Sequence, residues 1–94
     1  MVRLLLTEAD IRRQVKDYLT LKNWFVLYHL QGLGSMVGLP DLQAVKEGRI
    51  IFIELKRPGG NQRPSQVDFQ RKLEAAGGEY VLCRGIEDLQ ERGI

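Results

Sequence analysis

Residues 41–56 read DLQAVKEGRIIFIELK, and this stretch decides the fold. It contains two apolar runs, 41–46 and 49–55, separated by Glu47-Gly48, which we interpret as the turn of a β-hairpin. The second run is apolar at almost every position, so it predicts a central strand that is covered on both faces. A central strand of this kind requires further strands and helices from the rest of the chain.

The residues before the hairpin predict a helix, a strand and a loop. Thr7 is a good N-cap residue, and Asp10 three positions later gives a weak capping box. From residue 8 to about 22, apolar side chains recur at the spacing of one helix face. They are Ile11, Val15, Tyr18 and Leu19. Residues 24–30 are rich in β-branched and aromatic types and predict a strand, and the glycine-rich residues 31–40 predict a mobile loop.

The residues after the hairpin predict one strand between two helices. Residues 57–63 contain a Pro-Gly-Gly-Asn sequence and predict a loop. Pro64 suits the first position of a helix that runs to about residue 76, where two glycines provide the stop. Residues 79–84 predict the last strand, and 86–92 a short helix. The order is therefore α-β-β-β-α-β-α, an α/β fold in which helices flank a mixed sheet.

Length and composition narrow the class of protein. A chain of 94 residues suffices for one domain, which we place over residues 1–94. So small a domain has a thin core, and we expect self-association to bury more surface. No apolar run approaches the roughly 18–20 residues that span a membrane, and the N-terminal run is too short for a signal peptide. Cys83 is the single cysteine, which favours an intracellular protein.

Two acidic residues are expected to meet at one end of the hairpin. Asp41 opens the first strand after Pro40, and Glu54 lies near the end of the second. The start of one strand of a hairpin lies beside the end of the other. Glu54 and Lys56 share a face of their strand, whereas Leu55 turns into the core. Neighbouring carboxylates repel each other unless a cation lies between them, and their oxygens suit Mg²⁺ or Mn²⁺.

Glu8 and Gln66 lie on otherwise apolar helix faces. Glu8 shares its face with Ile11 and Val15, where a metal ion or the ammonium group of Lys56 would supply the partner that a buried acid needs. It is equally an acid of the first turn, which the helix dipole favours. Gln66 either points into the same site, where it could hold a water or a phosphate oxygen, or is half exposed at a loose helix start.

No other catalytic motif competes with this constellation. The chain has no glycine loop followed by Gly-Lys-Ser/Thr and no CxxC pair. A Ser-His-Asp hydrolase would need His29, the single histidine, as its base, and we expect His29 instead to pack, to support the site or to contact DNA. Ser35 could touch a phosphate, or it is a plain loop serine.

Net charge adds a weaker indication of the partner. The chain has 14 basic and 12 acidic residues. If Glu8, Asp41 and Glu54 are committed to a metal ion, 9 acidic residues remain and the balance becomes +5. Such a surface suits a polyanion, although a normally solvated surface explains the same charges.

The motifs resemble those of a known nuclease family. Gly38-Leu39-Pro40-Asp41, then Glu54-Leu55-Lys56, then Gln66 three residues before Phe69, resemble the pattern of the virus-type replication–repair nuclease (VRR-NUC) domain. This family is a branch of the PD-(D/E)xK superfamily, whose core is restriction-endonuclease-like. The resemblance extends from Glu8 to about Arg84. It implies that Asp41, Glu54 and the acid Glu8 are metal ligands, and that Lys56 and Gln66 act in catalysis.

The resemblance implies phosphodiester hydrolysis of DNA with Mg²⁺ or Mn²⁺. A metal ion would neutralise charge on the phosphate and activate a water, and the carbonyl of Leu55 could complete its ligand set. Short members of the family are similar to archaeal Holliday-junction resolvases, which are homodimers, so we expect a homodimer that cuts branched DNA such as four-way junctions. The alternatives are a flap or single-strand nuclease and a non-catalytic DNA-binding module. The candidate DNA contacts, each of which could be only a solvated side chain, are Arg57, Arg63, Lys72, Arg12 and Ser35.

Overall fold

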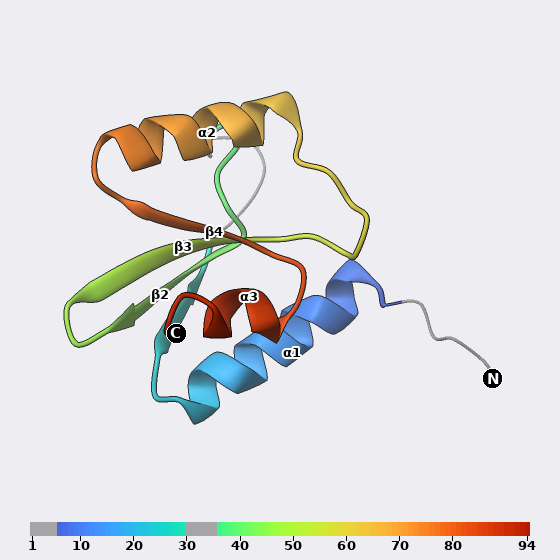
Figure 1. The fold of residues 1–94 in the computed structure, drawn as a ribbon, viewed down its shortest axis with the longest axis vertical. Coiled ribbons are helices and arrows are strands. Elements are labelled where there is room, and N and C mark those ends of the chain that lie inside the picture. Colours follow the sequence, from blue (N-terminus) through green and yellow to red (C-terminus); the bar gives the residue numbers. More distant parts are fainter. Residues whose placement is uncertain (1–5, 30–35) are drawn as a thin grey trace.

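The computed structural model describes residues 6–29 and 36–94 as a mixed α/β fold (Figure 1). Its element order is α-β-β-β-α-β-α, as the sequence predicts. The elements are α1 (Glu8–Leu21), β1 (Phe25–Tyr28), β2 (Leu42–Lys46), β3 (Arg49–Leu55), α2 (Pro64–Ala75), β4 (Glu79–Cys83) and α3 (Ile86–Gln90).

The four strands form one mixed sheet in the order β1-β2-β3-β4. The strands β1, β2 and β3 are antiparallel neighbours, and β4 lies parallel to β3. Glu47 and Gly48 both have positive φ, 50° and 82°, as a two-residue primed hairpin turn requires. Because β3 has a partner on each side, the expectation that it is a central strand is confirmed.

Helices cover the two faces of the sheet unequally. In Figure 1, α1 and α3 lie on one side of the sheet and α2 on the other. The apolar core lies mainly on the α1 side. It is formed by Ile11, Val15 and Leu19 of α1 with Leu42, Ala44, Ile51, Ile53, Leu55, Val81, Cys83 and Leu89. On the opposite side, the rings of Phe52, Phe69 and Tyr80 form a second, aromatic layer under α2.

Local signals in the sequence set the helix ends. Thr7 Oγ1 accepts the Asp10 N–H at 3.1 Å, and Asp10 Oδ2 accepts the Thr7 N–H at 2.9 Å, so the capping box at the start of α1 is formed. Pro64 occupies the first turn of α2, as expected. Gly77 takes a φ of 90° just after α2, a conformation that glycine adopts without strain. None of the helices in residues 6–29 and 36–94 is long and apolar enough to cross a membrane.

β2 begins at Leu42 and β4 ends at Cys83, each one residue inside its expected bounds, and two further expectations about the strands need correction. The first strand begins at Phe25 rather than at Trp24, because Asn23 has a φ of 67° and the Trp24 N–H still bonds to Leu19 O. The strand ends at Tyr28, and residue 30 lies outside the described part of the chain, as do residues 31–35 of the expected loop. β3 is not covered on both faces over its whole length. Ile50 is 47% exposed, since α2 packs over β4 and leaves the first half of that face open.

Candidate metal centre

Asp41 and Glu54 meet at one end of the β2–β3 hairpin, as the sequence predicts. The register that pairs Leu42 with Ile53 places Asp41 directly opposite Glu54. Asp41 Oδ2 accepts the backbone N–H of Leu55 at 2.7 Å, which fixes its carboxylate beside the end of β3. Two strand ends thus bring together carboxylates that lie thirteen positions apart in the sequence.

The backbone around Asp41 is held by two neighbouring segments. The His29 N–H donates to Asp41 O at 2.9 Å, and His29 Nδ1 donates to Pro40 O at the same distance. Gly38 has a φ of 81°, and a Cβ at this position would clash with Ser65 O at the start of α2. His29 therefore supports the site, one of the roles expected for it, and Gly38 allows the chain to pass close to α2.

Glu8 completes a cluster of three carboxylates. One ligand atom each from Glu8, Asp41 and Glu54 lies within 4.8 Å of the other two. Glu8 is the first residue of α1, and its side chain is exposed rather than buried as its place on the apolar face suggested. In Figure 1, α1 begins beyond the ends of the strands, so its first turn has no sheet to pack against. The inward direction expected for Glu8 nevertheless holds, because its carboxylate faces Asp41 and Glu54.

Lys56 and Gln66 flank the buried carboxylate of Glu54. Lys56 Nζ lies 3.6 Å from Glu54 Oε2, and Gln66 Nε2 donates to the same oxygen at 2.9 Å. Gln66 Oε1 in turn accepts the Arg63 N–H at 2.8 Å. Gln66 is only 3% exposed, so it points inward rather than lying half exposed at a loose helix start.

These side chains line a cavity of about 360 Å³, together with Leu39. Glu54 is 2% exposed, and its Oε1 has no hydrogen-bond partner among the described residues. Burial, and then the negative charge of Asp41, raise the pKa of Glu54 to about 8, while Lys56 lowers it. When both carboxyls are ionised their negative charges repel each other, so without a cation the protonated form of Glu54 is favoured. A buried, unpartnered carboxylate oxygen facing two further carboxylates is an arrangement that a divalent cation fits.

The direction of the Leu55 carbonyl follows from the hydrogen bonds of the neighbouring N–H groups. The Leu55 N–H points to Asp41, whereas the next N–H, of Lys56, bonds to Cys83 O of β4 on the other side. In an extended strand the N–H and C=O of one residue point to the same side. The Leu55 carbonyl therefore points toward the Asp41 side of β3, as a ligand of the expected kind would.

The candidate DNA contacts are dispersed around this cavity. Arg63 lines it, and Arg57 lines an adjacent cavity of about 230 Å³ that also includes Glu8 and Lys56. Lys72 lies on the exposed side of α2, where it pairs with Asp68 at 2.9 Å. Ser35 lies outside the described residues.

Arg12 has a role that the sequence interpretation missed. Its Nη2 lies 3.4 Å from Asp41 Oδ1, so in this structure it pairs with a site carboxylate rather than extending freely toward a nucleic acid. Arg12 follows Glu8 by four residues and therefore lies on the same side of α1. That spacing was the signal that could have placed it at the cluster.

The chain matches no protein-family model, and no curated protein matches it.

Proposed function

We propose that this protein is a metal-dependent DNA endonuclease of the VRR-NUC type that uses Mg²⁺ or Mn²⁺. The observation that carries the proposal is the carboxylate cluster, whose ligand atoms lie within 4.8 Å of one another beside an ammonium group. Its three acids come from α1, β2 and β3, so the folded chain and not one local motif assembles it. An oxygen-rich set without histidine or cysteine selects hard cations.

Each residue of the cluster has a distinct task in this proposal. Asp41 and Glu54 hold the ion from two adjacent strand ends, Glu8 closes the set from α1, and the Leu55 carbonyl supplies a neutral oxygen. Gln66 orients Glu54 through the 2.9 Å hydrogen bond to Oε2, leaving Oε1 available. A hydrogen-bond partner of this kind fixes the orientation of the metal ligand and also raises the affinity for the metal ion.

Hydrolysis of a phosphodiester requires stabilisation of negative charge and an oriented water. When bound, Mg²⁺ or Mn²⁺ would neutralise phosphate oxygens and lower the pKa of a water. Lys56 lies in the same cavity and is only 15% exposed, so its ammonium group acts in a partly dehydrated setting where its charge is weakly screened. It stabilises charge that develops on the phosphate, and Arg63 lines the same cavity.

The substrate and assembly belong to the same proposal. We expect a homodimer cutting branched DNA, with two sites related by a two-fold axis making two nicks. An open apolar area on the α2 side of the sheet supports self-association. It consists of Phe25, Leu27 and Ile50, with Phe25 63% exposed at the edge strand. An intracellular setting suits the single, unpaired Cys83.

Cleavage of four-way, flapped, single-stranded and linear DNA, each with Mg²⁺, Mn²⁺ or EDTA, tests the proposal. We expect metal-dependent cutting with four-way DNA preferred. Preference for flapped or single-stranded DNA would assign the same chemistry to another substrate. Binding without cutting under every metal would favour the non-catalytic DNA-binding module.

Substitution at the cluster gives the matching control. Asp41→Ala should abolish cleavage and leave DNA binding largely intact, because basic groups and not the carboxylate position the nucleic acid. Asp17→Ala removes an exposed acid elsewhere on α1 and should cut like the wild type. Full cleavage by Asp41→Ala would show that the site is assigned wrongly. Light scattering tests the dimer, and a monomer near the chain mass of 10.8 kDa would contradict it.

A further inference from the structure

A second cavity lies at the opposite end of the hairpin from the carboxylate cluster. It has a volume of about 240 Å³ and is lined by residues around the Glu47-Gly48 turn, the end of α1 and the last residues of the chain. We call it the hairpin-end cavity. Arg49 at this end and Glu54 at the other are roughly 16 Å apart along β3, at about 3.3 Å per residue. The cavity is therefore separate from the proposed metal centre.

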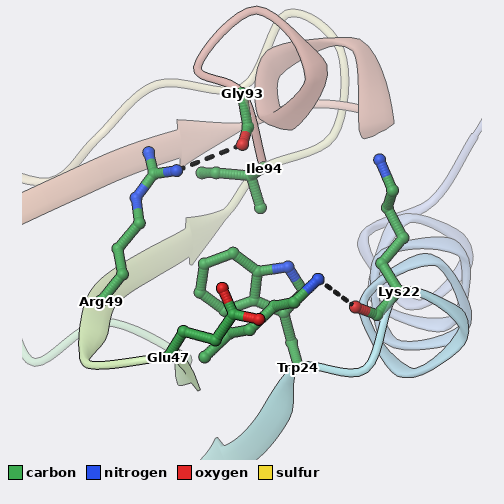
Figure 2. Close-up of a pocket in the computed structure, with 7 residues that line it drawn as sticks. Lys22, Trp24, Glu47, Arg49, Gly93 and Ile94 are labelled. Carbon is green, nitrogen blue, oxygen red and sulfur yellow. Dashed lines mark hydrogen bonds between the residues drawn. The ribbon is translucent and has the colours of Figure 1, made fainter.

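Three cationic side chains surround the hairpin-end cavity. Figure 2 shows Lys22 on one side and Arg49 on the other, with the Trp24 ring between them. Lys46 is the third cation and donates to Lys22 O at 2.8 Å. Arg49 is fixed by an ion pair with Glu79 at 2.8 Å.

Lys22 and Lys46 have unused hydrogen-bond donors and no ion-pair partner among the described residues. Neither Lys22 nor Lys46 has a carboxylate at ion-pairing distance among the described residues. Each ammonium group has three N–H donors, and each uses one, Lys22 with Tyr18 Oη at 3.3 Å and Lys46 with Lys22 O. The remaining donors can serve an anion in the cavity. Arg49 adds a positive charge that its hydrogen bonds to the carbonyls of Gly93 and Arg92 hold in place.

The size of the cavity limits the ligand. A volume of about 240 Å³ falls below the roughly 300–1,000 Å³ of pockets for drug-sized molecules. A single tetrahedral oxyanion with some of its water fits this space, whereas a whole nucleotide does not.

We propose that the hairpin-end cavity binds a phosphoryl group, held by the ammonium groups of Lys22 and Lys46 beside the fixed guanidinium of Arg49. The group belongs either to a nucleic-acid backbone or to free phosphate, since both present the same oxygens to these donors. Glu47 also lines the cavity and opposes the binding of an anion, which makes it a useful test position.

Trp24 provides a direct readout, because it is the single tryptophan of the chain and lines the cavity. Its fluorescence is followed during titration with inorganic phosphate in EDTA, at constant ionic strength set with chloride. Wild type should give a saturable change. Lys22→Gln and Lys46→Gln should each weaken binding about tenfold, the usual loss for one hydrogen bond to a charged group. Lys16→Gln, an exposed lysine of α1 outside the cavity, should leave it unchanged.

Glu47→Gln should tighten phosphate binding several-fold, a gain that a misfolded variant could not produce. No saturable change in wild type, or an equal loss in Lys16→Gln, would overturn the proposal. Displacement of phosphate by an oligothymidylate without terminal phosphates would support the site and assign it to the nucleic-acid backbone. Retention of phosphate in its presence would support the site with free phosphate as ligand. Because the titration needs neither metal nor cleavage, its result is independent of the proposed nuclease activity.

Discussion

The side-chain amide of Gln66 donates to Glu54 Oε2 at 2.9 Å, so a residue of α2 orients the carboxylate that β3 brings to the cluster. Loss of this donor should leave Glu54 free to rotate. We expect Gln66→Ala to weaken Mn²⁺ affinity by roughly 10–100-fold, the range seen when the hydrogen-bond partner of a metal ligand is removed. Calorimetric titration with Mn²⁺ measures it. Gln14→Ala, on the exposed side of α1, is the control, and equal affinities for both variants would contradict the role of Gln66.

Glu54 should make the metal-free protein less stable as the pH rises. Burial and the nearby Asp41 raise its pKa from 4.5 to about 8. Between these values the folded protein binds a proton that the unfolded chain has lost, so the free energy of unfolding falls with rising pH. One pKa unit corresponds to about 1.4 kcal/mol, and the total loss should therefore be a few kcal/mol.

The measurement is urea unfolding in EDTA from pH 5 to 9. The wild type should lose stability up to about pH 8 and then level off, since Glu54 has a pKa of about 8 in the folded state. Glu54→Gln carries no titrating group at this position and should show a much flatter profile, with higher stability than wild type at pH 8. Parallel profiles for the two proteins would show that Glu54 does not titrate as described.

Metal binding should release a proton from the same residue. At pH 7 Glu54, with a pKa of about 8, is mostly protonated in the metal-free protein, and a cation binds only its ionised form. We expect Mn²⁺ affinity to rise about tenfold per pH unit between pH 6 and 8, with about one proton released per ion. Calorimetry in two buffers of different ionisation enthalpy counts the protons. A pH-independent affinity would place the ion away from Glu54.

The sequence predicted the parts of the site that depend on local periodicity. Alternation along β3 placed Glu54 and Lys56 on one face, and the hairpin turn placed Asp41 opposite Glu54. The helical spacing of the apolar residues predicted the direction in which Glu8 points but not that its side chain is exposed. Spacing along a helix does not show how far the neighbouring sheet extends. In the same way, the pattern of β3 could not show that α2 leaves Ile50 uncovered.

Contacts between distant segments were beyond these local patterns. The spacing from Glu8 could place Arg12 on the cluster side of α1 but could not show that it pairs with Asp41, 29 positions away. No pattern indicated that Gly38 passes close to Ser65. Both depend on how α1 and α2 lie against the sheet, which packing of the whole chain decides. The resemblance to VRR-NUC named residues that the structure brings together but gave no account of how these segments hold them.

Alanine substitutions at Gly38 and Gly59 allow the cost of a left-handed backbone to be measured separately from the cost of a steric clash. Both have a φ of 81°, but a Cβ at Gly38 would clash with Ser65 O, whereas one at Gly59 has nothing within 4 Å. Gly59→Ala should cost only the left-handed conformation, about 1–2 kcal/mol. Gly38→Ala should cost more in urea unfolding and should also lower cleavage, because it forces the Leu39-Pro40-Asp41 segment away from α2. Equal losses of stability in both variants would contradict this contact.

Lys56 allows metal binding and chemistry to be tested separately. Its Nζ lies 3.6 Å from Glu54 Oε2 and lowers the pKa of that carboxyl. Lys56→Ala should therefore raise the pKa of Glu54 further and weaken Mn²⁺ binding at pH 7, by an amount that shrinks as the pH rises. In saturating Mn²⁺ at pH 9 we expect cleavage to fall by about 10²–10³, the loss typical of one charge-stabilising donor. Lys16→Ala removes an exposed lysine of α1 and should cut at the wild-type rate at this pH. If Lys56→Ala also cut at that rate, its ammonium group would serve only to ionise Glu54.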